Sequence, residues 1–304
     1  MGRYQERKIR KMGMNPDQIA TAKAALFLVL RKSLADAGLT TVADDVLICP
    51  LCWKEKRLDE LSLEHCIPGS VSGETFALTC TPCNNTHGSK LDSHLKGYQA
   101  LTDALKGKGA VRVRMNDAGR RAAANMEFEP DKGIHFKIVG KATREDAWKS
   151  IKKSREAGDT SPFKVTMQLG HTIVGLKVGL LRAGYLLMFR RFGYWFASTP
   201  AAAQIRDRIM NPSAIVPDVM SLTGEFRDFP VSLDTDHVLI QADINGVRFI
   251  FVVIRLKRET ESIHFAMMPL PHERQNEFFA LAEQHAKHNP VMTFENIPPS
   301  AIIL

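Results

Sequence analysis

Apolar residues recur at helical spacing over several stretches of the chain. The first stretch follows Asn15-Pro16, where Asn suits the N-cap of a helix and Pro suits its first position. We predict a helix from about Pro16 to Ala37, ended by Gly38. Similar patterns predict three later helices, over residues 143–156, 171–210 with a break near Pro200, and 271–288.

Other stretches alternate between apolar and polar residues, as strands do. Residues 110–141 alternate around a turn at Asp131-Lys-Gly133, which predicts a hairpin, and residues 162–169 predict a further strand. A second β region begins near Val231, where Asn245-Gly246 between apolar strands is a strong hairpin signal. Because helical and strand patterns are both present, we predict the α+β class, with a mixed α/β C-terminal region.

The chain has 304 residues, which suits about two domains of ordinary size. Gly107 and Gly109 mark the clearest boundary, directly after a cysteine-containing segment. We divide the sequence into an N-terminal basic segment and helix (1–44), a cysteine module (45–106) and a mixed α/β region (107–304). The role of the last region stays open between DNA binding, sensing and oligomerisation.

Composition excludes several classes of protein. With 44% hydrophobic and 24% charged residues, the chain is neither wholly disordered, nor collagen-like, nor a disulfide scaffold. The most apolar stretch, 172–198, is too interrupted for a membrane span, since it contains Lys177, Arg182, Arg190 and Arg191. The basic N-terminus lacks the apolar segment of an export signal. We expect a soluble, cytoplasmic protein with no membrane partner.

The charge balance favours a polyanionic partner. There are 41 Lys and Arg against 33 Asp and Glu, a formal charge of +8, and nucleic acid is the commonest partner of a basic protein. A basic surface kept for solubility is the alternative. Clustering favours nucleic acid, because residues 106–121 contain one acid, Asp117, and six cations. These candidate phosphate contacts are Lys106, Lys108, Arg112, Arg114, Arg120 and Arg121.

All five cysteines lie between positions 49 and 83. Four form two Cys-x-x-Cys pairs, Cys49 with Cys52 and Cys80 with Cys83. Two such pairs in a cytoplasmic chain indicate four thiolates around one tetrahedral zinc ion, with a redox pair or idle thiols as the alternative. Cys66 has no partner in this pattern, and we predict that it is a small buried residue.

The segment around these pairs contains a series of short motifs. In chain order they are Cys49/Cys52, Glu64-His65 with Pro68, Cys80/Cys83 with Asn84-Asn85, Gly88, and Asp92 with Leu95. This order resembles the HNH (His-Me finger) endonuclease family, in its zinc-knuckle subgroup. The resemblance covers about fifty of the 304 residues. It departs at Thr75, where the family has an Asn that braces the loop of the general base.

The resemblance implies a zinc-stapled ββα-metal nuclease module. His65 would be the general base, since a neutral imidazole near pH 7 takes a proton from water. Glu64 and Asn84 would hold a catalytic Mg²⁺ or Mn²⁺ ion, for which oxygen ligands are suited. Cys49, Cys52, Cys80 and Cys83 would hold the structural Zn²⁺.

Three further residues are supporting candidates: Asn85, His87 and Asp92. Asp92 lies eight residues after Asn84, about 12 Å along a helix, so we interpret it as the partner of a loop or a basic side chain rather than as a ligand of the same ion. His87 is one turn from Asn84. There it would ligate the metal ion, contact a phosphate or simply lie at the surface.

We therefore predict a metal-dependent HNH endonuclease that acts on DNA, with RNA left open as a substrate. A place in restriction or phage defence follows from family analogy alone. Two alternatives remain. One is a non-catalytic, zinc-dependent protein that binds nucleic acid or has a regulatory role. The other is a nuclease that is silent until its C-terminal region binds an activating ligand, a protein or a second copy of the chain.

Overall fold

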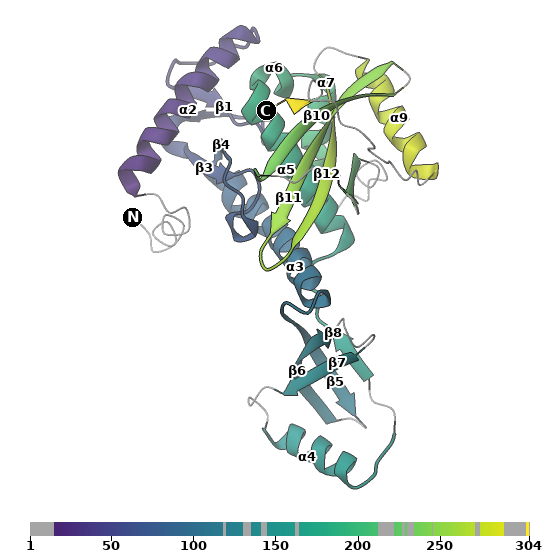
Figure 1. The fold of residues 1–304 in the computed structure, drawn as a ribbon. Coiled ribbons are helices and arrows are strands. Elements are labelled where there is room, and N and C mark those ends of the chain that lie inside the picture. The colour runs from purple at the N-terminus through teal and green to yellow at the C-terminus, as the bar shows by residue number, and fades with distance from the viewer. Residues whose placement is uncertain are drawn as a thin grey trace.

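The structure is a computed structural model, and it describes residues 15–117, 120–129, 135–140, 145–161, 164–211, 222–226, 229, 234–244, 246–270, 274–288 and 302–303. These residues form a large body and a smaller lobe, joined at the end of a long helix, α3 (Ser89–Leu105) (Figure 1). Within the described residues, no helix combines the length and the apolar character that a membrane crossing requires.

The body begins with α2 (Pro16–Asp36). The side chain of Asn15 accepts a hydrogen bond from the backbone of Gln18 at 2.8 Å, and the Gln18 side chain accepts one from the backbone of Asn15. This capping box, with Pro16 in the first turn, confirms the predicted helix start. Two short antiparallel pairs follow, β1 (Val46–Ile48) with β2 (Glu55–Arg57) and β3 (Leu61–His65) with β4 (Phe76–Cys80).

The chain then enters a π-helical turn, η3 (Cys83–Gly88), which runs directly into α3. After the lobe, it returns to the body as α5 (Ile173–Phe192), followed by α6 (Tyr194–Ala197) and α7 (Pro200–Met210). The predicted break near Pro200 is confirmed, because Thr199 caps α7 and Pro200 opens it.

The second β region forms one antiparallel sheet in the order β13-β10-β11-β12-β9. Its strands are β9 (Thr223–Phe226), β10 (His237–Ile244), β11 (Val247–Lys257), β12 (Glu261–Pro269) and β13 (Ile302–Ile303), with α9 (Gln275–His288) after β12. The predicted hairpin joins β10 to β11, and Gly246 takes the left-handed conformation there, with φ of +74°.

Helix α5 is the centre of the body. It packs against α3 on one side and against β11 and β12 on another (Figure 1). A Cβ at Gly184 would lie 2.6 Å from the Cβ of Ala266 in β12, so only glycine allows the helix this close to the sheet. The buried residues of α2, the cysteine segment, α5 and the sheet form one continuous hydrophobic core.

The lobe is inserted in the chain between α3 and α5. It consists of β5 (Ala110–Asp117), β6 (Arg120–Glu129), β7 (His135–Gly140), α4 (Glu145–Glu156) and β8 (Lys164–Met167), with the strands in the antiparallel order β7-β6-β5-β8. The turn predicted at 131–133 lies outside the described residues. The lobe has a small core of its own, formed by Val113, Met115, Ala124 and Met126. Residues 107–304 therefore contribute to both the lobe and the body.

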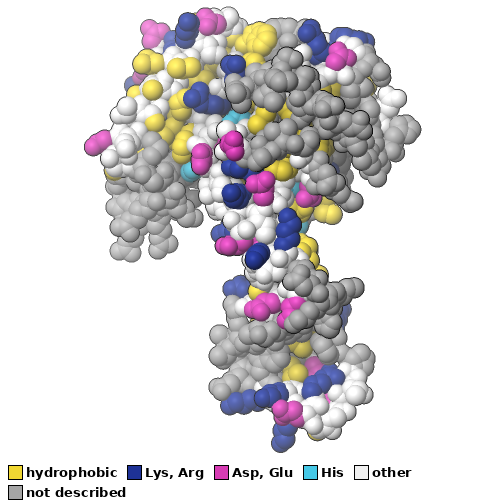
Figure 2. All heavy atoms as spheres, viewed as in Figure 1, with side chains coloured by type: hydrophobic (Ala, Val, Ile, Leu, Met, Phe, Trp, Pro, Cys, Tyr) yellow, Lys and Arg dark blue, Asp and Glu magenta, His cyan; other side chains and the backbone are white. Residues whose placement is uncertain are grey.

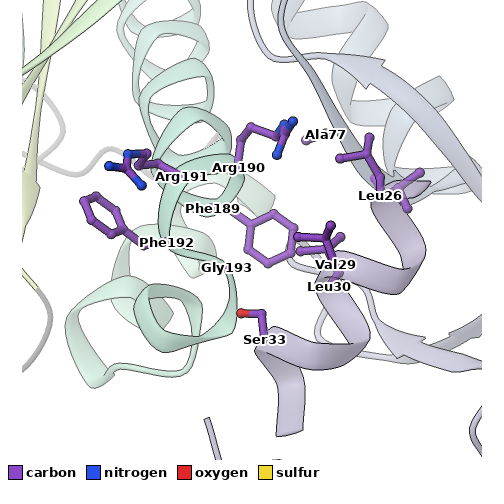
Figure 3. Close-up of a pocket in the computed structure, with 11 residues that line it drawn as sticks. Leu26, Val29, Leu30, Ser33, Ala77, Phe189, Arg190, Arg191, Phe192 and Gly193 are labelled. Atoms are coloured by element: carbon purple, nitrogen blue, oxygen red, sulfur yellow. The ribbon is translucent and has the colours of Figure 1, made fainter. Parts of the chain in front are cut away.

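A small cavity of about 140 Å³ separates α2 from the C-terminal end of α5. Figure 3 shows Leu26 and Leu30 of α2 facing Phe189 and Arg190 of α5 across it. Pockets that enclose small-molecule ligands usually measure about 300 Å³ or more, and we assign no ligand to this one.

Candidate functional site

The four cysteines of the two Cys-x-x-Cys pairs lie together, with all of their sulfur atoms within 4.8 Å of one another. Cys49 and Cys52 flank the turn after β1, Cys80 ends β4 and Cys83 begins η3. The sulfur atoms of Cys52 and Cys80 are 3.8 Å apart. A tetrahedral zinc ion with bonds of about 2.3 Å places neighbouring sulfur atoms about 3.8 Å apart. The donor set therefore fits a structural metal ion, as predicted.

The local backbone positions the four cysteines. Trp53 takes a left-handed conformation, with φ of +55°, which turns the chain tightly after Cys52. The backbone N–H of Cys80 points at the Cys49 sulfur at 3.3 Å. Hydrogen bonding from the Cys49 thiol lowers the pKa of Cys80 to about 2 and that of Cys52 to about 6. Hydrogen bonds within the cluster, together with burial, raise the pKa of Cys49 and raise that of Cys83 to about 12. The protein alone therefore favours the thiolate, the form that binds metal, at two of the four cysteines.

The metal centre is embedded in the body. The Tyr185 hydroxyl of α5 donates a hydrogen bond to the Pro50 carbonyl, between the first two cysteines, at 2.8 Å. The Arg206 guanidinium of α7 lies 4.1 Å from the centre of the Trp53 ring. The cysteine turn is thus held by helices that follow it by more than a hundred residues in the chain. Cys66 is buried apart from this cluster, and burial raises the pKa of its thiol.

Glu64 and His65 end strand β3, opposite Ala77 and Phe76 of β4. Successive strand residues point to opposite faces, and the two side chains differ accordingly. Glu64 is 2% exposed, whereas His65 is only half-buried. The His65 ring packs on the Phe76 ring with centroids 4.4 Å apart. Its Nε2 atom lies so near Gly69 that a Cβ there would be 3.0 Å away.

The Glu64 carboxylate has two partners. The Thr79 hydroxyl donates to Oε2 at 2.5 Å, and Oε1 forms an ion pair with Nη2 of Arg182 in α5. Arg182 is also 2% exposed, and its Nη1 lies 3.5 Å from the Asp92 carboxylate. Burial lowers the pKa of Arg182 to about 10, so the guanidinium stays charged at neutral pH. Glu64 and Arg182 therefore form a buried ion pair, and the partly exposed carboxylate of Asp92 adds a second negative charge beside it to complete a charge cluster.

Gly88 makes room for this cluster. A Cβ on Gly88 would lie 2.7 Å from both Arg182 Nη2 and Glu64 Oε1. Gly88 and Asp92 are one helical turn apart, so the same side of the helix meets Arg182 at both positions. The absence of a side chain at Gly88 thus lets the ion pair approach the helix closely.

Asn84 connects the start of the helix to β3. It is 6% exposed, and its Nδ2 donates to the Ser62 hydroxyl at 2.9 Å and to the Leu63 carbonyl at 3.1 Å. The amide is thus bound to the strand directly before Glu64. Asn85 is exposed, and its carbonyl accepts from the Ser89 hydroxyl at 2.6 Å. The side chain of His87 lies outside the described part of the structure.

The loop between β3 and β4 is held by a residue from the distant β region. The backbone N–H groups of Glu74 and Thr75 donate to Oδ2 of Asp236 at 2.8 and 3.2 Å. The Thr75 hydroxyl donates to Oδ1 at 3.3 Å, and His237 Nδ1 lies 2.7 Å from the same oxygen. Burial raises the pKa of Asp236, but these hydrogen bonds outweigh burial and lower it to about 2.

A catalytic divalent ion does not fit at Glu64 while Arg182 is in place. Both carboxylate oxygens are engaged, and a buried guanidinium already balances the charge. A cation bound by Glu64 and Asn84 would require this ion pair to separate. We therefore assign no chemical step to a divalent ion in this geometry.

The predicted phosphate contacts lie apart from this site. Lys106 donates from Nζ to the Glu261 carbonyl of the body at 2.9 Å. Four of the others have exposed side chains at the start of the lobe or on its strands: Lys108, Arg112, Arg114 and Arg121. The side chain of Arg120 lies outside the described part.

Sequence reasoning missed two residues of the site, Arg182 and Asp236. Arg182 had a signal, because an arginine in the middle of an apolar, glycine-containing helix must find a buried partner. Asp236 had no comparable signal. Comparison with known proteins adds nothing to this geometry: no family model matches the chain, and no significant match was found among curated proteins or solved structures.

Proposed function

We propose that this protein is an endonuclease that hydrolyses phosphodiester bonds in DNA. One observation supports the proposal most. Asn84 binds the strand residue next to Glu64-His65, and it directly follows Cys83 of the metal cluster. Glu64, His65 and Asn84 of the motif therefore lie together, the first two on the β3–β4 hairpin and the third in the turn that begins the following helix. We further propose that the cluster ion is zinc, because four thiolates are its preferred structural ligands.

In this proposal His65 is the general base. Its imidazole is half-buried and rests on Phe76, and the loop at Gly69 covers one edge of the ring. It accepts the proton of a water molecule as the water oxygen bonds to phosphorus and the phosphorus–oxygen bond to the leaving group breaks, and the leaving oxygen takes up a proton from solvent. By resemblance, the products carry a 5′-phosphate and a 3′-hydroxyl.

The ion pair between Glu64 and Arg182 favours a second candidate. In this candidate the site is closed, and cleavage requires a ligand or partner that moves α5. If the site never opens, the protein binds nucleic acid without cutting it. A role in restriction or phage defence rests on the family resemblance alone.

Nicking of a supercoiled plasmid tests the proposal. Zinc-loaded protein would be incubated with and without Mg²⁺ or Mn²⁺, the ions that the family resemblance implies, so that a requirement for them is measured and not assumed. The variants are His65→Ala and the control His171→Ala, which changes a histidine outside the site. We expect nicking by the wild type and by His171→Ala, and none by His65→Ala. Full activity of His65→Ala would overturn the assignment of the base. DNA binding without nicking, by a wild type with its full zinc content, would favour the closed or non-cutting candidate.

A further inference from the structure

The two faces of the lobe sheet differ in character. One face is apolar and faces α4, and it contains Val113, Met115, Ala122, Ala124 and Met126, all of them buried. Strand β5 alternates strictly between buried and exposed residues. The opposite face therefore presents every second residue to solvent. Its exposed members are Ala110, Arg112, Arg114, Asn116, Arg121, Ala123, Lys164 and Thr166.

Strand register gathers the cations of this face. Asn116 pairs with Arg121 of β6 on one side and with Lys164 of β8 on the other. Arg114 pairs with Ala123 on one side and with Thr166 on the other, and its guanidinium lies against the side-chain amide of Gln168. Since neighbouring strands are about 4.8 Å apart, these positions form one patch across three strands.

Few acids oppose this patch. Asp117 points to the other face, where it is buried and forms an ion pair with Arg155 of α4 at 2.8 Å. Among the described side chains of the exposed face, the acids are Glu127 and Glu129, at the opposite end of β6 from Arg121. Figure 2 shows Lys and Arg side chains, with acids among them, at the end of the lobe where α4 lies, so positive charge is not confined to the sheet.

We infer that this sheet face, defined by Arg112, Arg114, Arg121 and Lys164 and called here the basic sheet face, docks onto duplex DNA. The inference deepens the proposed function, since it names the surface that would hold the substrate of the site in the body. Its cations lie on three strands, with about 10 Å between the outer strand axes. The B-DNA major groove is about 12 Å wide, so long cationic side chains on this face can reach the groove and the phosphates on both of its sides.

The side chains suit the chemistry of that groove. Arginine forms paired hydrogen bonds with guanine edges or with phosphates, and asparagine does so with adenine edges. Asn116 and Asn125 stand next to the arginines on neighbouring strands. An A-form RNA duplex has a major groove too narrow for side chains to read, so the geometry favours DNA over RNA.

Helix α4 provides a matched control on the other side of the lobe. Its Lys149 and Lys153 are exposed, so reversing both changes the net charge as much as reversing two arginines of the basic sheet face. A merely diffuse attraction between a basic lobe and DNA would respond equally to both changes. A docking face would respond to the reversal of its arginines and not to the reversal of the α4 lysines.

Fluorescence anisotropy with a labelled duplex tests the inference. The full chain would be used with His65→Ala throughout, so that binding is measured without cleavage. We expect Arg112→Glu/Arg114→Glu to weaken binding at least about tenfold. The slope of log K against the logarithm of the salt concentration should become less steep by about 2. Lys149→Glu/Lys153→Glu should weaken it less than about threefold. Zinc content and thermal midpoint would confirm that both variants are folded.

Equal losses in the two variants, or no loss in the arginine variant, would overturn the inference. Equal or tighter binding of a duplex RNA of the same sequence would overturn the choice of DNA. Failure here is distinguishable from failure of the proposed function. Nicking by the wild type together with unaffected binding by the arginine variant rejects only the docking face. Face-dependent binding without any nicking rejects only the endonuclease.

Discussion

The body and the lobe place their charges in opposite ways. In the body, Glu64, Arg182 and Asp236 are buried, and each contacts a residue from a distant part of the chain. In the lobe, a small apolar core leaves most of the described cations in solvent. Buried charges are fixed in position and little affected by salt, whereas exposed charges are mobile and screened. Under the proposed function, the body would carry the chemistry and the lobe the recognition of DNA, and substitutions in each region test that division.

The largest effect is expected at the metal centre. Cys80→Ser should remove the bound ion and unfold the body, because structural zinc contributes on the order of 10 kcal/mol to small zinc-bound folds. Cys66→Ala is the matched control, a buried cysteine outside the cluster, and should keep the metal at a cost of about 1–2 kcal/mol. Metal analysis and thermal unfolding followed by circular dichroism measure both. Equal metal content in the two variants would contradict the assignment.

Breaking the buried ion pair comes next. Arg182→Met leaves the Glu64 carboxylate buried without its cation and should lower the free energy of unfolding by about 3–5 kcal/mol. The double variant Arg182→Met/Glu64→Gln should recover part of this loss, since it removes both charges. Urea unfolding of the single and double variants gives the coupling free energy between Arg182 and Glu64. A loss of under about 1 kcal/mol in the single variant would mean that the pair is not buried as described.

The pH dependence of stability should reveal Asp236. Its pKa is about 2 in the folded protein, against a usual value of 3.8. A lowered carboxyl pKa means that the stabilisation is complete above pH 4 and is lost as the pH falls toward 2, by about 2 kcal/mol in all. Asp236→Asn should therefore be less stable at pH 7 and should lose less stability over that acid range. An unchanged acid profile would contradict the bracing role.

The smallest effect is expected from the corresponding ion pair of the lobe. Asp117 is fully buried, but the side chain of Arg155 is 27% exposed, so water partly compensates when the pair is broken. Arg155→Met should cost about 1–2 kcal/mol, less than Arg182→Met. Hydrogen exchange should place the loss within β5, β6 and α4. A loss spread over the body would show that the two regions do not behave separately.

Local signals account for what could be predicted from the sequence. Asn15-Pro16 and Asn245-Gly246 act through their own backbone and neighbours, and the structure confirms both. The spacing of the four cysteines similarly predicted one cluster. The partners of Glu64 and Thr75 could not be predicted, since Arg182 and Asp236 reach them only through the packing of α5 and the sheet. The pattern at 110–141 indicated strands but not that the chain later returns to the body, because that depends on which core each element joins.

Chemical rescue tests the central claim, a cutting site at His65, most directly. Duplex cleavage would be followed for the wild type and for His65→Gly, with and without added imidazole. We expect cleavage by the wild type, none by His65→Gly, and partial return of cleavage when imidazole enters the space left by the side chain. Cleavage by His65→Gly at the wild-type rate, or none by zinc-loaded wild type with Mg²⁺ or Mn²⁺, would contradict it.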